Sequence, residues 1–370
     1  MFMDYILESE SGFSNGVSQE TMDEINNIEI PTNLSEYAGL SPFECISKAN
    51  YEFAKGNADM FKAIAESEMK YIKENGTEPI WEAEDHQNVF QRFIQGVKDI
   101  IGKITAFFGK IIKGVETKVS EIYNKFAGRL DKKIADARGT GFLDKKVTIK
   151  KYDPTIGANI LNKDPLSVLN KVDGYKSIKA AFDAEKDEEG KTIETKGAVS
   201  QLYSAIFSGL HGADTDSSSS IRRALHNAMV GRSESVSYAQ AAAEVQYFVK
   251  DPKASSLKAE LKKRYNEIKK DLGKTIDEAK KASKKAERST KKGSATGAYC
   301  NILNKYVQAM TITYRETSSC LTGKWFQACR LYLVLSGQVS KTNHDVKKAE
   351  KKAEKEAKKA NNESFSFSFE

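Results

Sequence analysis

Apolar residues recur at intervals of three and four along three long stretches of the chain, and this spacing is the strongest constraint on its fold. The stretches are residues 88–136, 255–288 and 298–340. Such intervals place apolar side chains on one face of a helix. Only 6 of the 370 residues are proline, so few positions interrupt long helices. We therefore expect a mainly α-helical protein whose long amphipathic helices pack as an irregular bundle.

One short segment departs from the helical pattern. Residues 146–152, Lys-Val-Thr-Ile-Lys-Lys-Tyr, alternate between polar and apolar side chains. Alternation with a period of two is typical of a strand, so we expect at most a small β element there. In the stretch that follows, we expect shorter helices over 165–185, 198–210 and 221–250, the last one broken near Gly231.

Composition and turn residues divide the chain into predicted segments. Residues 1–40 are rich in Ser, Asn and acidic residues with scattered apolar ones, which predicts a disordered acidic segment. The remaining segments are a small helical hairpin with an acidic linker (41–87), a helical core (88–250), a basic helix with a linker (251–294), an apolar helical region (295–342), and a Lys/Glu/Ala helix with a flexible tail (343–370).

Charge is distributed unevenly between the two ends of the chain. Residues 1–85 hold 18 acidic and 5 basic residues, a net of −13, so the remaining 53 basic and 33 acidic residues give +20. Such an asymmetry indicates one of three arrangements. The acidic part masks the basic part, is removed from it, or binds a different partner.

The stretch 88–136 has two interpretations. Lysines flank its Ile/Phe face, which is typical of a helix lying on a membrane surface. Alternatively, the same face packs inside a helical bundle, for which apolar partner helices exist downstream. Glycines such as Gly96 are costly inside a helix, so they serve either close packing or bending. The face consists of Phe93, Ile94, Val97, Ile101, Ile104, Phe108 and Ile111.

The stretch 251–294 carries 15 basic and 7 acidic residues, a net of +8. This excess predicts contact with nucleic-acid phosphates without sequence preference, the alternative being a solvated helix face. No aromatic residues alternate with the lysines, which disfavours stacking on single strands. The candidate contacts are Lys262, Lys263, Arg264, Lys269, Lys270, Lys280, Lys281, Lys284, Lys285 and Arg288.

No pattern of residues indicates a catalytic site, a cofactor or a metal. The chain has no nucleophile elbow, phosphate-binding loop or zinc-protease pattern, and its 4 histidines are not spaced as ligand pairs. Its 4 cysteines lack a Cys-x-x-Cys pair, which favours buried reduced thiols over disulfides or a metal site. We therefore expect a protein that is not an enzyme.

The beginning of the chain and its hydropathy bear on localisation. The first eight residues carry Asp4 and Glu8 and no basic residue, so we expect no secretory signal peptide. No apolar run is long enough to span a bilayer, which takes about 20 residues. A protein that stays in a reducing cytoplasm fits both observations.

Particular stretches resemble a known group of proteins. They are the acidic Trp-containing linker Ile80-Trp81-Glu82-Ala83-Glu84-Asp85, the Phe/Ile/Lys helix after it, Phe126-Ala-Gly-Arg-Leu-Asp-Lys-Lys133, and Lys150-Lys151-Tyr152. A helix with Cys320 and Cys329 then leads into a basic tail and Asn-Glu-Ser-Phe. In this order the chain resembles virion structural proteins, the internal head proteins, of large tailed bacteriophages.

The resemblance implies a structural protein of the capsid interior that reaches the virion after assembly in the host cytoplasm. Its implied partners are other virion proteins and packaged DNA. It also implies cleavage by a prohead protease after a Leu/Ile-x-Glu tripeptide. Glu82 is the candidate processing site, and cutting there would remove 16 acidic and 5 basic residues, leaving a chain of +18. Other matches to the tripeptide, which are frequent by chance in a Glu-rich segment, end at Glu8, Glu36 and Glu66.

Two other functions remain open from the sequence. One is a membrane-associating protein that acts through helix 88–136, for example in genome delivery. The other is a cellular scaffold protein whose charged helices contact partners. The oligomeric state is not predicted.

Overall fold

The computed structural model describes residues 17–26, 90–102, 104–105, 143–184, 193–210, 218–242, 257–286 and 294–335, together with Lys351, Lys352 and Lys355. Within these residues the fold is mainly helical, as the apolar spacing predicts. The predicted hairpin at 41–87, the continuation of the first long helix beyond residue 105, and most of the segment at 343–370 lie outside the described residues.

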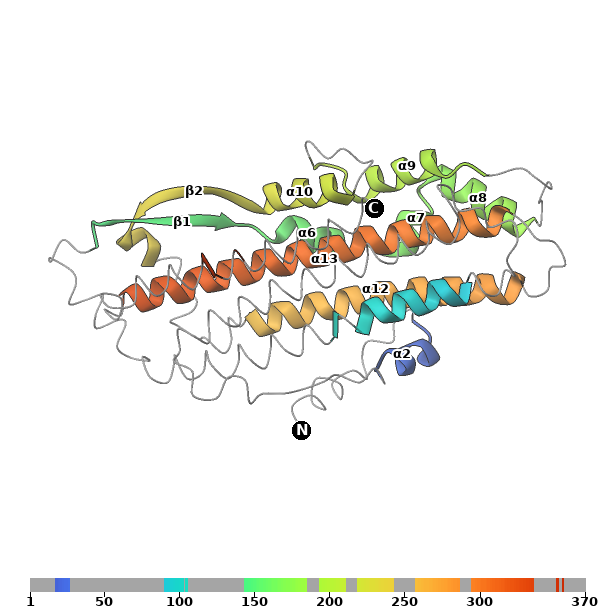
Figure 1. Cartoon of the computed structure of the whole chain (residues 1–370), viewed down its shortest axis with the longest axis horizontal. Coiled ribbons are helices and arrows are strands. Elements are labelled where there is room, and N and C mark those ends of the chain that lie inside the picture. The colour runs from blue at the N-terminus through green and yellow to red at the C-terminus, as the bar shows by residue number, and fades with distance from the viewer. Residues whose placement is uncertain are drawn as a thin grey trace.

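The longest helix, α13 (Ser294–Leu335), runs along the middle of the molecule (Figure 1). It contacts α12, α10, α9, α8, α6 and β1. Nearly every described side chain between Ala295 and Thr322 is buried, including Tyr299, Tyr306 and Tyr314. A helix buried in this way forms the interior of its fold, and the six elements that contact α13 pack around it.

Two helices cover one side of α13. They are α12 (Leu257–Ala286) and the helix that contains residues 90–102 and 104–105, here called the Phe90 helix. The buried hydroxyls of Thr105 and Tyr265 lie 2.9 Å apart and join them. The apolar line predicted along α12 is buried in full, at Leu261, Tyr265, Ile268, Leu272, Ile276 and Ala279.

Short helices cover the other side of α13 (Figure 1). The stretch 165–185, for which the sequence predicts one or two short helices, forms two, α7 (Pro165–Leu169) and α8 (Asp173–Asp183). Asp164 starts α7 as its N-cap, accepting a hydrogen bond from the Ser167 N–H at 3.0 Å. The others are α6 (Thr155–Leu161), which the sequence pattern did not predict, α9 (Lys196–Ile206) and α10 (Ser218–Met229).

The predicted strand exists as β1 (Lys146–Tyr152), and its partner is β2 (Val230–Ser237) in an antiparallel pair with Val147 opposite Val236. The prediction of helix over residues 230–237 is therefore wrong. This segment, Val-Gly-Arg-Ser-Glu-Ser-Val-Ser, has weak helix formers, and the ladder to β1 provides the hydrogen bonds that a helix would have supplied. At Gly231 a β-carbon would lie 3.2 Å from that of Lys151, so the strands approach closely there.

The apolar helical region expected over 295–342 begins at Ser294, the first residue of α13. One boundary nearer the N-terminus differs from the prediction. Within the stretch 1–40, residues Gln19–Asn26 form the helix α2, which packs on α12. The prediction of disorder is wrong for this part of the segment, since α2 finds its hydrogen-bond partners on a distant helix.

The packing of α6 on α13 predicts an asymmetric response to adding a methyl group. A β-carbon at Gly157 would lie 1.9 Å from Thr317 Oγ1, whereas one at Gly96 in the Phe90 helix would meet nothing within 4 Å. We expect Gly157→Ala to lower the free energy of unfolding by about 1–3 kcal/mol. Gly96→Ala should raise it by about 0.5–1 kcal/mol, because alanine favours the helix.

Urea denaturation of both variants beside the wild type measures the two changes. Equal effects of the two substitutions would contradict the close contact between α6 and α13.

Candidate nucleic-acid interface

The outer face of α12 carries a row of lysines. The helix holds 11 basic and 5 acidic residues, a net of +6. Its apolar face is buried against α13 and the Phe90 helix, so most of its cations lie on the opposite face. Residues seven and four apart share one face of a helix. The lysine row, spaced in this way, consists of Lys263, Lys270, Lys274, Lys281 and Lys285.

Exposure and pairing differ along the row. Lys263 and Lys281 are exposed, as is Lys284 beside the row, and Lys270 is partly exposed. Lys274 forms an ion pair with the α7 cap Asp164. Lys285 pairs with Asp183 at the end of α8, at 2.8 Å. These two pairs tie one flank of the row to α7 and α8.

Two of the predicted nucleic-acid contacts serve the bundle instead. The Arg264 side chain is only 7% exposed and forms ion pairs with Glu267 and Glu260 of its own helix. Lys269 is 3% exposed, and its Nζ lies 5.6 Å from the centre of the Tyr265 ring, a cation–π contact. For both residues the prediction is wrong, because positive charge along a sequence does not show which side chains a neighbouring helix covers. Lys262 is partly exposed, and Arg288 lies outside the described residues.

The other flank of the row is covered by α2. The Lys280 ammonium lies 3.1 Å from Glu24 and 3.4 Å from Glu20. Glu24 also lies 3.1 Å from Lys98 of the Phe90 helix, so one carboxylate bridges two helices. Burial raises the pKa of Glu24, but the hydrogen bonds and charges of Lys98 and Lys280 outweigh it and hold that pKa below its usual value.

Asp277 of α12 holds the N-terminus of α2. Its carboxylate accepts hydrogen bonds from the Ser18 N–H at 2.6 Å, the Ser18 hydroxyl at 2.6 Å and the Thr21 hydroxyl at 2.7 Å. A carboxylate at a helix N-terminus also meets the positive end of the helix dipole. Burial raises the pKa of Asp277, and these donors together with Lys280 lower it further than burial raises it.

A partly buried cluster ties four helices together at one end of the row. The Glu278 carboxylate accepts hydrogen bonds from Lys179 Nζ at 2.5 Å and from the Tyr299 hydroxyl at 2.9 Å. The Tyr299 ring stacks on Phe182 with centroids 5.2 Å apart and meets Phe90 edge-on. Sequence reasoning missed this cluster, because its members come from α8, α12, α13 and the Phe90 helix.

The predicted apolar face of the Phe90 helix is directed into the bundle. Val97, Ile101 and Ile104 are buried in the core, and Phe93 and Ile94 are partly buried against it. These residues therefore fit the bundle interpretation. Phe108 and Ile111 lie outside the described residues, as does the candidate processing site Glu82. Among the helices that the structure describes, none is long and apolar enough to cross a membrane.

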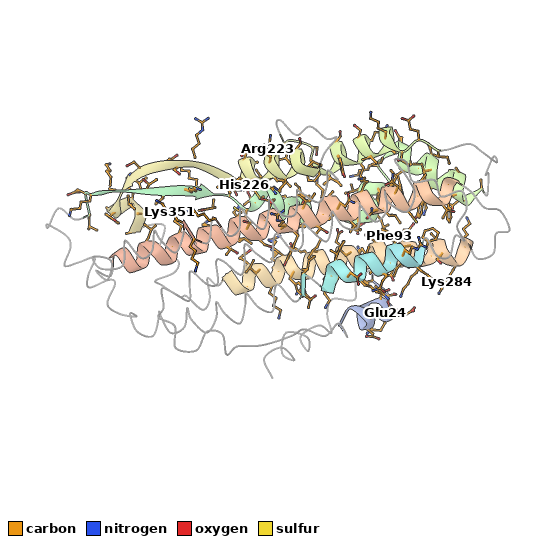
Figure 2. All side chains as sticks on the ribbon, viewed as in Figure 1. Glu24, Phe93, Arg223, His226, Lys284 and Lys351 are labelled. Atoms are coloured by element: carbon orange, nitrogen blue, oxygen red, sulfur yellow. The ribbon has the colours of Figure 1, made fainter. Side chains whose placement is uncertain are left out.

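The two sides of the molecule are visible in Figure 2. Glu24, Phe93 and Lys284 lie at the same end of the bundle, whereas Arg223 and His226 of α10 lie on the other side of α13. His226 Nδ1 is 3.5 Å from the Glu316 carboxylate. Within the described ranges, no three histidine, cysteine or acidic side chains gather as metal ligands.

Cys300 and Cys320 are buried free thiols, so the prediction of buried reduced cysteines is confirmed for these two. Burial raises the pKa of both thiols. A thiol that resists ionisation is a poor nucleophile and a poor metal ligand. Cys45 lies outside the described residues.

No protein-family model, no curated protein and no solved structure matches the chain.

One buried acid on α12 predicts how stability depends on pH. Burial raises the pKa of Asp271 well above its usual value, although the hydrogen bond from the Tyr306 hydroxyl opposes the rise. The folded state therefore keeps a proton that the unfolded chain releases at about pH 3.9. Stability is fully present below that pH and decreases as the pH rises towards the folded-state pKa.

We expect Asp271→Asn to remove this decrease of stability with rising pH. The variant should melt at a higher temperature than the wild type at pH 7, and the two melting temperatures should converge near pH 3. Thermal unfolding followed by circular dichroism across pH 3–8 measures the difference. A variant that is less stable than the wild type at pH 7 would contradict a raised pKa of Asp271.

Proposed function

We propose that the chain is a non-enzymatic virion structural protein of the internal head class. In this proposal it associates with packaged DNA through the lysine row of α12. The observation that carries the proposal is the outward position of Lys263, Lys270 and Lys281 on a helix whose opposite face is fully buried. The location inside a virion rests on the resemblance of the linker and tail sequences to internal head proteins of large tailed bacteriophages.

The geometry of the row fits a phosphate backbone. Lys263 and Lys285 are 22 positions apart in a continuous helix, which corresponds to about 33 Å at 1.5 Å per residue. This length is close to one turn of duplex DNA. Lysine contacts phosphate as a point charge and carries no information about base sequence, so the expected binding is electrostatic and independent of sequence.

The other strongly polar groups on α12 support a binding role over catalysis. Asp271 is buried against Tyr306, and Glu278 is held between Lys179 and Tyr299. Each of these carboxylates joins helices within the bundle. A packed bundle with a basic outer face is suited to holding a polyanion against other structural proteins.

Binding to DNA is tested with the triple variant Lys263→Gln/Lys270→Gln/Lys281→Gln. Affinity for a random-sequence duplex is measured by fluorescence anisotropy across 50–200 mM salt. Each lost phosphate contact lowers the slope of log affinity against log salt by about 0.9, so the triple variant should lose about 2.7. Affinity at the lowest salt should fall at least tenfold.

The matched control is Lys146→Gln/Lys150→Gln/Lys151→Gln on β1, which removes the same charge from exposed lysines across the molecule. It should keep most of the affinity and of the salt slope. Equal losses in the two variants would show that binding depends on net charge alone and would contradict a role for the row.

The virion assignment has its own test. We expect the chain in purified phage particles, where intact-mass analysis would find it beginning at Ala83 after cleavage at Glu82. An uncut chain in the particles would contradict the processing site, and absence from the particles would contradict the assignment.

A further inference from the structure

The described contacts that α2 makes with α12 and the Phe90 helix are mostly polar. Among its described side chains and the two residues before it, only Val17 and Thr21 are buried. The other described contacts are three hydrogen bonds to Asp277 and the ion pairs of Glu20 and Glu24. An eight-residue helix is not stable by itself in water, so these contacts hold α2 in its folded form.

The acids of α2 lie where phosphates would be expected. Glu24 places one carboxylate oxygen 3.1 Å from both Lys98 and Lys280. Lys280 directly precedes Lys281 of the lysine row, and Lys284 lies one turn further along the helix. A phosphate oxygen bound to Lys98 and Lys280 would occupy the same position as Glu24, so both anions cannot bind together.

We propose that α2 is a detachable acidic strap that competes with nucleic-acid phosphate for Lys98 and Lys280. Binding of a duplex along the row and docking of α2 are then mutually exclusive, and the docked strap lowers the apparent affinity for DNA. This inference rests on the proposed function. It adds that α2 regulates the access of nucleic acid to the lysine row. It also assigns Lys98 and Lys280 to the interface.

Charge at the surface explains why the strap can be displaced. The helix α2 carries Glu20, Asp23 and Glu24 and no basic residue. Its ion pairs are partly exposed to solvent, at side-chain exposures of 19–69%. Exposed pairs of this kind contribute little and are screened by salt. A duplex presents many phosphates along the lysine row at once, so it can replace the ion pairs of α2.

The test loosens the strap without changing any charge. In Ser18→Ala/Thr21→Val, Asp277 loses both side-chain hydroxyl donors, while valine preserves the volume of the buried threonine. If α2 is docked in most molecules, the apparent affinity for DNA equals the intrinsic affinity multiplied by the small undocked fraction. We expect the full-length variant to bind a random-sequence 20-base-pair duplex about tenfold more tightly than the wild type.

The strap itself is followed by hydrogen exchange. Backbone amides of residues 19–26 in the wild type should exchange faster when the duplex is saturating.

The matched control, Thr155→Val/Ser177→Ala, removes one threonine and one serine hydroxyl on α6 and α8, away from α2. It should leave affinity and exchange unchanged. Glu20→Gln/Glu24→Gln provides a second variant that should also bind more tightly.

The outcomes separate this inference from the proposed function. Binding that depends on Lys263, Lys270 and Lys281 but is equal in wild type and both strap variants, with α2 still protected in the complex, would overturn the strap alone. Absence of DNA binding by the wild type and by both strap variants would overturn the proposed function together with the strap.

Discussion

Burial of α13 is the constraint on which the other contacts of the molecule depend. A helix of 42 residues with few exposed side chains requires a complete cover of other elements. Its interior also contains polar residues, which cost free energy when buried without partners. Three of these, Thr311, Thr313 and Thr317, donate their hydroxyls to the carbonyl four residues earlier. The helix therefore satisfies these three hydroxyls itself, whereas the hydroxyls of Tyr299 and Tyr306 donate to Glu278 and Asp271 of α12.

Because α13 must be covered, the surrounding helices carry their apolar surface and their charges on different faces. The helices that cover α13 direct their apolar faces inward, so α12 presents its lysines to the outside. Among the described residues, two carboxylates that lie between helices are tied to partners. Glu278 is held by Lys179 and Tyr299, and Asp271 is bonded to Tyr306. The exposed lysine row and the acidic α2 that flanks it are consequences of the same packing.

The periodicity of the sequence predicted the elements that are defined by their own residues. The spacing of apolar residues was sufficient for α12 and α13, and alternation identified β1. Its partner β2 was missed because the stability of that strand comes from a ladder to residues about 80 positions away. The helix α2 was missed for the same reason, since Thr21 and the Asp277 that holds it are 256 positions apart. Likewise, the charge of Arg264 and Lys269 was visible in the sequence, but the neighbours that bury them were not.

The central claim is that the outer face of α12 is the surface that meets nucleic-acid phosphate, and lysine footprinting tests it most directly. The full-length protein is acetylated with a limiting reagent, with and without a random-sequence duplex, and each lysine is quantified by mass spectrometry. The account predicts protection concentrated at Lys263, Lys270 and Lys281, with Lys146 and Lys150 of β1 equally reactive in both samples. Protection spread evenly over both sets, or found on β1 alone, would contradict it.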